Sequence, residues 1–182
     1  MLSGRSKKAL RILAGCLGGF FLAWLGYALF ETNFYRRALP AEIETTGLAT
    51  TGSDFNPRLL LVPMRHEACG AVVFQMSQHT VDAIAKIGAA FFETAQQGRG
   101  YPKGHPLSHY YSYEPWLETP LPSGWIGDGI WSLGLHCARL DRALVQRMVA
   151  AAREPGSCYT TKPEAQLVVI PRLKLIVFTF FG

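Results

Sequence analysis

The sequence predicts an α+β protein in which one N-terminal transmembrane helix precedes a small two-layer sandwich. Three patterns indicate this: an early apolar run, two amphipathic helical segments, and short β-branched or aromatic segments on either side of them. The 182 residues leave room for one compact domain of about 150 residues and an anchor. Because hydrophobic residues make up 49% and charged residues 17% of the chain, a largely disordered protein is excluded.

A basic tail and an apolar run open the chain. Residues 1–11 contain four Lys or Arg side chains, and residues 12–30 contain no charged side chain. A helix of this apolar length would measure about 28 Å, close to the thickness of the hydrocarbon core of a bilayer. We expect an uncleaved signal anchor, with a cleaved secretory signal as the alternative.

The basic residues also predict an orientation and a compartment. By the positive-inside rule, the N-terminus stays in the cytoplasm and the C-terminal domain is periplasmic or extracellular. The protein is then a single-pass protein of the inner or plasma membrane. Within the apolar run, Gly15, Gly19 and Ala23 recur at every fourth position and predict a helix-packing ridge.

The net charge of +5 argues against a nucleic-acid partner once it is divided along the chain. The tail holds four of the positive charges, and from residue 32 onward 14 Lys and Arg face 12 Asp and Glu. Nucleic-acid binders concentrate basic residues on one face, so we expect no nucleic-acid binding.

Residues 31–57 are expected to form a linker, and residues 58–182 an exported α+β domain. The predicted order is β-β-α-long loop-α-β-β. The strands are expected at 58–62, 70–76, 165–170 and 173–181, and the helices at 80–97 and 140–153. Thr80 is the expected N-cap of the first helix.

The insertion between the two predicted helices, residues 99–138, is rich in proline and aromatic residues. Loops of this length are uncommon without a role, and Tyr and Trp are typical of binding surfaces. The expected partner-binding residues are Tyr110, Tyr111, Tyr113, Trp116, Trp125 and Trp131. The alternative is that these rings cover the sheet as part of the core.

Cysteine and histidine residues suggest a disulfide more than a metal site. In an oxidising compartment we expect Cys137 to pair with Cys158, because they flank the second helix; Cys69 with Cys158 is the alternative. The histidines occur as half-sites without the spacing of a metal-binding motif, so no metal and no cofactor are expected. The weak candidate ligands are His66, His105, His109 and His136.

The function expected from these patterns is that of a non-catalytic accessory subunit. The sequence contains no G-x-S-x-G, H-E-x-x-H or phosphate-binding glycine motif, so we expect no enzymatic activity. The exported domain is expected to bind another membrane or envelope protein. The alternatives are a glycan- or peptidoglycan-binding module that uses the tryptophans, and a metal-binding protein or enzyme that uses the clustered His and Cys.

Overall fold

The computed structural model describes residues 4–53, 69–127 and 129–182, and the chain divides into two compact units, Met1–Arg36 and Arg37–Gly182. The first unit contains one long helix, α1 (Gly4–Arg36). Its segment Leu13–Arg36 is long and apolar enough to cross a membrane, with a mean hydropathy of 1.8. The predicted apolar helix is therefore present, and it continues beyond the expected end at residue 30.

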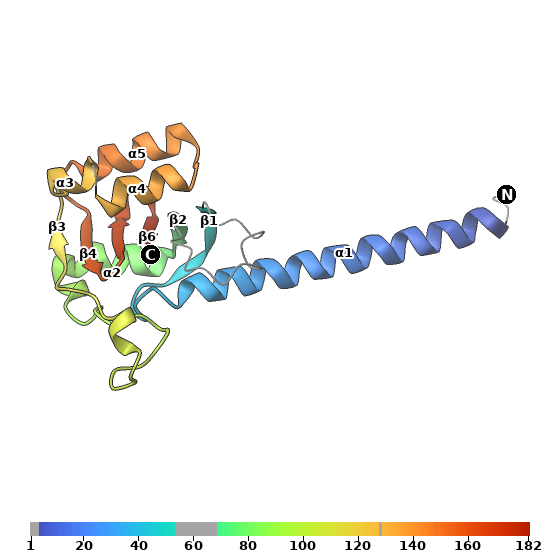
Figure 1. Cartoon of the computed structure of the whole chain (residues 1–182), viewed down its shortest axis with the longest axis horizontal. Coiled ribbons are helices and arrows are strands. Elements are labelled where there is room, and N and C mark those ends of the chain that lie inside the picture. The colour runs from blue at the N-terminus through green and yellow to red at the C-terminus, as the bar shows by residue number, and fades with distance from the viewer. Residues whose placement is uncertain (1–3, 54–68, 128) are drawn as a thin grey trace. The chain divides into compact units, whose positions relative to one another are not determined.

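The second unit is built on one antiparallel sheet of six strands among the described residues, in the order β1-β2-β6-β5-β4-β3 (Figure 1). The predicted α+β class is confirmed. The strands are β1 (Thr45–Ser53), β2 (Cys69–Met76), β3 (Leu117–Glu118), β4 (Cys158–Lys162), β5 (Ala165–Ile170) and β6 (Leu175–Phe181).

Helices and short 3₁₀ helices, labelled η, connect and cover these strands. Their bounds are α2 (Gln78–Ile87), η2 (Gly88–Phe92), η3 (Ser108–Tyr111), α3 (Ser123–Ile126), α4 (Ile130–Cys137), α5 (Arg142–Ala152) and η4 (Pro171–Leu173).

Two segments differ from the expected element order. The expected strand at 58–62 lies outside the described residues, whereas residues 45–53, expected to belong to the linker, form β1 and pair with β2. The first predicted helix begins earlier and ends earlier than expected. Ser77, not Thr80, is its N-cap and accepts a hydrogen bond from the Thr80 backbone N–H, and Gly88 ends the α-helix with a φ of 58° that glycine adopts readily.

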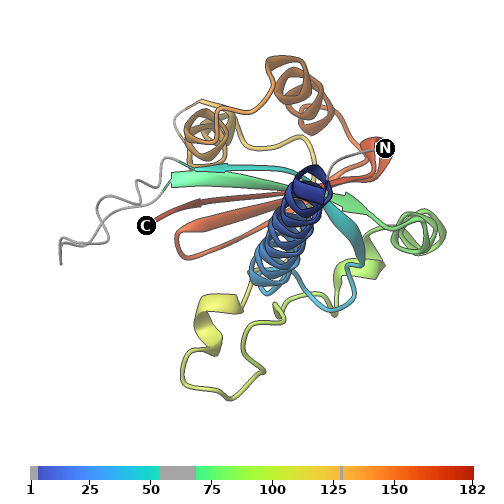
Figure 2. The same ribbon diagram turned by 90° about the vertical axis from the view of Figure 1, so that its right-hand side faces the viewer.

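The central strands of the sheet are buried on both faces, and the finer expectation of a two-layer sandwich is not confirmed. One face packs against α4 and α5 and holds alternate residues of the central strands, such as Val73 and Val177. Their neighbours Val72 and Phe178 point to the other face by strand alternation and are also buried. Figure 2 shows α4 and α5 on one side of the sheet, and η2 with the loop that contains η3 on the other.

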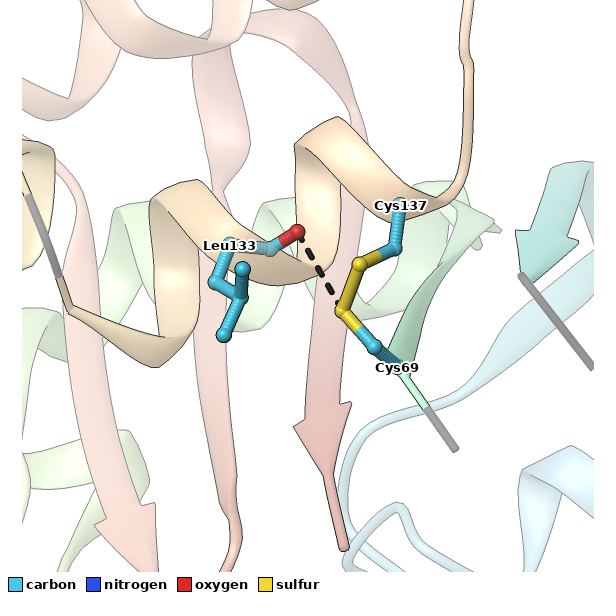
Figure 3. The surroundings of a disulfide bond; sticks show 3 residues. All are labelled: Cys69, Leu133 and Cys137. Atoms are coloured by element: carbon cyan, nitrogen blue, oxygen red, sulfur yellow. Dashed lines mark hydrogen bonds between the residues drawn. A yellow bond between two sulfur atoms is a disulfide. The ribbon is translucent and has the colours of Figure 1, made fainter. Parts of the chain in front are cut away.

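The disulfide joins Cys69 to Cys137 and not Cys137 to Cys158, which corrects the expected pairing and also its alternative. Cys69 opens β2, and α4 packs against that strand, so the two Cα atoms lie 5.7 Å apart. Figure 3 shows the bridge, with the Cys69 sulfur 3.4 Å from the carbonyl oxygen of Leu133. Cys16 and Cys158 are free thiols.

Strand geometry explains why Cys158 is not part of the bridge. Its neighbour Tyr159 packs into the core on the α4 side of the sheet, so Cys158 points to the opposite face. Three steps between strands separate β4 from β2. At about 4.8 Å per step, that distance is roughly twice the Cα separation that a disulfide can span.

Removal of the disulfide is expected to destabilise the globular unit. The bridge spans 68 residues of sequence, which corresponds to about 4 kcal/mol in the loop-entropy model. We expect Cys69→Ala, Cys137→Ala and the double variant to lose similar amounts of unfolding free energy in non-reducing chemical denaturation, with Cys16→Ser as the control. Peptide mapping that linked Cys137 to Cys158 would contradict this pairing.

Candidate functional site

Two of the six aromatic residues expected to bind a partner are part of the core. Trp131 is fully buried between α4 and the sheet. Tyr113 is also buried, and its hydroxyl donates a 2.8 Å hydrogen bond to the Ala38 carbonyl oxygen. Burial raises the pKa of Tyr113 above its ordinary value. Neither ring is accessible to a partner.

Trp116 and Trp125 are partly buried and packed against other rings. The Trp116 ring lies 4.5 Å from that of Phe92, and its Nε1 donates to the Ala95 carbonyl oxygen at 2.7 Å. Trp125 packs edge-on against Tyr159, with the ring centroids 4.9 Å apart. Because Trp131 is also buried, the three tryptophans do not form the exposed row that a glycan-binding platform requires.

Tyr110 and Tyr111 remain at the surface of the insertion. Tyr110 is 49% exposed. Tyr111 is half-buried and lies 5.9 Å from the Lys162 Nζ, which also faces the ring of Phe178. Burial lowers the pKa of Lys162, an effect that the negative charge of Glu164 opposes. Of the expected surface, only the loop around Tyr110 is thus open to solvent.

The histidines that the structure describes do not come together as a metal site. His105, His109 and His136 are exposed, and His66 lies outside the described residues. His105 stacks on Tyr101, and His109 packs on Tyr110. In the part of the chain that the structure describes, no three His, Cys, Asp or Glu side chains are grouped so that they could hold a metal ion.

A groove of about 530 Å³ runs between α4 and α5. The two helices are joined by a tight turn at Arg139, whose φ is 50°. Asp141 is the N-cap of α5, and its side chain accepts a hydrogen bond from the Leu144 backbone N–H. The groove is lined by apolar side chains and by a polar set. The apolar residues are Leu135, Leu140, Val145 and Val149, and the polar ones are Ser132, His136, Arg139, Arg142 and Gln146.

The charged side chains that line this groove are two arginines, Arg139 and Arg142. Residues 132–153 contain four arginines and one acidic residue, and the carboxylate of that residue, Asp141, caps α5. Among the described residues, none of these arginines forms an ion pair with a carboxylate. Arg139 also occupies a left-handed conformation that glycine or asparagine adopts at lower cost. The groove therefore combines apolar lining residues with two arginines that have no carboxylate partner among the described residues.

The groove could not be predicted from the sequence because α4 was not expected. Residues 130–137 fall within the expected insertion, and Gly134 in the middle of α4 weakens the helical pattern there because glycine is unfavourable in helices. The polar side of α5, with Arg142 and Arg147, was visible in the sequence. Without the facing helix it gave no sign of a groove.

A second cavity, of about 420 Å³, lies on the other face of the sheet between α2 and the start of β4. Cys158 lines it together with Ile84 and Glu118. Burial, and to a lesser extent the charge of Glu118, raises the pKa of Cys158 to about 11. The thiol is therefore a poor nucleophile at neutral pH.

No protein-family model matches this chain, and neither the curated proteins nor the solved structures contain a match.

Alanine substitutions are expected to lower the unfolding free energy much more at a core aromatic residue than at an exposed one. Trp131→Ala removes a fully buried ring and should cost about 3–5 kcal/mol of unfolding free energy. Tyr110→Ala should change it by less than about 0.5 kcal/mol. Chemical denaturation followed by near-ultraviolet circular dichroism tests both values, and equal effects of the two substitutions would be inconsistent with this assignment.

The thiol of Cys158 is expected to react slowly in the folded protein. With its pKa raised to about 11, its thiolate fraction at pH 8 is about a hundredfold below that of an unfolded cysteine. Alkylation kinetics of the Cys16→Ser protein, folded and denatured, measure this difference. Similar rates in the two states would show that Cys158 is accessible and ionised.

Proposed function

We propose that the protein is a non-catalytic, single-pass membrane protein whose exported domain binds an acidic segment of another membrane or envelope protein. The groove between α4 and α5 is the observation that carries this proposal.

The anchor is α1. The segment Leu13–Arg36 has 24 residues, which is about 36 Å of helix and enough for the 30 Å hydrocarbon core. Large apolar side chains such as Phe20, Phe21 and Leu22 are exposed along it, as expected for a helix that faces lipid. By the positive-inside rule, the basic tail favours a cytoplasmic N-terminus. Gly15, Gly19 and Ala23 would then offer a ridge to a partner helix.

The disulfide supports the proposed compartment. Disulfides persist in oxidising compartments and are rare in the cytosol. The Cys69–Cys137 bridge lies in the globular unit, on the C-terminal side of α1. A periplasmic or extracellular position of this unit is consistent with both the bridge and the charge of the tail.

The composition of the groove favours a protein segment as its occupant. Interface cores are apolar and enriched in arginine, and complementary charge selects the partner. An amphipathic segment could place apolar side chains on Val145 and Val149 and carboxylates near Arg139 and Arg142. The aromatic insertion contributes to this function by supplying α4, one wall of the groove.

Photo-crosslinking in intact membranes tests this proposal. A photoreactive amino acid at Gln146, in the groove, is expected to crosslink a partner through a peptide rich in Asp and Glu. The same amino acid at Asp82, on the exposed side of α2, is the matched control. Equal crosslinking at the two positions, or a crosslinked peptide without acidic residues, would overturn the proposed site.

Charge reversal in the groove is expected to weaken partner binding. Arg139→Glu and Arg142→Glu each place a carboxylate opposite the acidic segment and should lower the affinity roughly tenfold. Lys86→Glu on α2 makes the same change in net charge away from the groove and should leave binding unchanged. The crosslink yield at Gln146 measures the effect, and equal losses in all three variants would point to net charge instead of the groove.

A further inference from the structure

The loop of residues 101–111, called here the tyrosine loop, is an ordered structure with an exposed apolar tip. Successive backbone hydrogen bonds shape it, including His105 N–H to the Pro102 carbonyl and Ser108 N–H to the His105 carbonyl. The Gln97 side chain donates to the Tyr101 carbonyl oxygen at 2.8 Å. Despite this support, Leu107 and Tyr110 are 41% and 49% exposed. The loop thus holds two large side chains in solvent.

The root of the tyrosine loop is tied to the residues that directly follow α1. The Gly100 backbone N–H donates to the Arg37 carbonyl oxygen at 2.9 Å, and the Arg37 guanidinium lies 5.5 Å from the Tyr101 ring. The Arg99 guanidinium donates to three carbonyl oxygens of the same segment. These belong to Leu39, Ala41 and Ile43, at 3.2, 2.8 and 3.0 Å.

The charge of this region is suited to an anionic surface. Residues 94–113 contain no Asp or Glu. Lys103 is exposed on the loop, and Arg37 is exposed at its root. A basic surface with exposed tyrosine and leucine has the composition of protein segments that bind the interface of a membrane.

We propose that the tyrosine loop binds the lipid interface of the membrane that α1 crosses, with Tyr110 and Leu107 at the headgroup–acyl boundary and Lys103 near lipid phosphates. This inference rests on the proposed function, in that α1 must span the bilayer. A helix of about 36 Å exceeds the 30 Å core but not the 40–45 Å of the whole bilayer. Arg37, the next residue, then lies at the headgroup layer, and chain connectivity brings the root of the loop there too.

A lipid occupant agrees with this placement better than a protein does. The root is at the membrane surface through covalent connection, whatever the tilt of the globular unit. In Figure 2 the loop extends from the side of the sheet opposite α4 and α5. A loop docked on lipid would therefore leave the α4–α5 groove accessible to a protein partner.

Depth-dependent fluorescence quenching tests the proposal on the full-length protein. The Cys16→Ser chain, with its disulfide intact, carries an environment-sensitive fluorophore on Tyr110→Cys or, as the control, on Ala150→Cys in α5. It is reconstituted in vesicles of phosphatidylcholine with phosphatidylglycerol that contain headgroup-spin-labelled lipid. We expect about twofold stronger quenching at position 110 than at position 150, as for a segment at the headgroup boundary.

A pair of charge variants tests the role of Lys103. Lys103→Glu should reduce quenching at position 110 in vesicles with phosphatidylglycerol. Lys86→Glu, which makes the same charge change on α2, should leave it unchanged. Vesicles of phosphatidylcholine alone should give weaker quenching for the unsubstituted loop, because anionic headgroups attract the basic residue.

Alkaline extraction of the same vesicles separates the two proposals. If the protein resists extraction but position 110 is quenched no more than position 150, the loop does not bind lipid and the membrane anchor stands. The same result with a protein crosslink at position 110 would assign the loop to a protein partner. If the protein is extracted, α1 is not an anchor, and both the proposed function and this inference are overturned.

Discussion

The pairing of β6 with β2 on one side and β5 on the other is the constraint on which the rest of the globular unit depends. These three strands are apolar on both faces, with Val72, Val73, Ile176 and Val177 fully buried. An antiparallel sheet often leaves one face to solvent, but this one requires cover on both. One cover is the α4–α5 pair, and the other is formed by η2 and the loop that follows it. Much of the insertion is therefore structural.

Sequence periodicity predicted the elements whose own residues decide their structure. The β-branched runs of β5 and β6 and the apolar stripe of α5 could be recognised without tertiary information. The strand β1 could not, because Thr45–Ser53 has no apolar alternation and is stabilised by its hydrogen bonds to β2. For α4 the obstacle was Gly134. A Cβ there would clash with the Gly70 carbonyl oxygen and with Thr179, so a residue that is unfavourable in helices is the one that lets this helix approach the sheet.

The disulfide shows the same limit for the candidate sites. Proximity in sequence favoured a disulfide between Cys137 and Cys158. Successive side chains of a strand point to opposite faces. Because Tyr159 points to the face covered by α4, Cys158 points away from Cys137. The burial of two of the expected binding residues has a related reason. Composition identified Trp131 and Tyr113 as large amphipathic side chains, but it could not separate rings that cover a sheet from rings that meet a partner. The two kinds of ring are distinguished only in the structure, where the central strands are covered on both faces.

The positions of the charged side chains in the fold, and not the net charge of the unit, determine which surfaces could bind a charged partner. From residue 32 onward basic and acidic residues nearly balance, which argued against any basic surface. The fold nevertheless separates them: Glu44 contacts His79 near α2, Glu154 pairs with Arg172, and Asp141 is engaged as a helix cap. The remaining arginines of the α4–α5 region are left without carboxylate partners among the described residues. Because apolar side chains also line their groove, the proposed acidic amphipathic chain fits it better than the evenly charged backbone of a nucleic acid does.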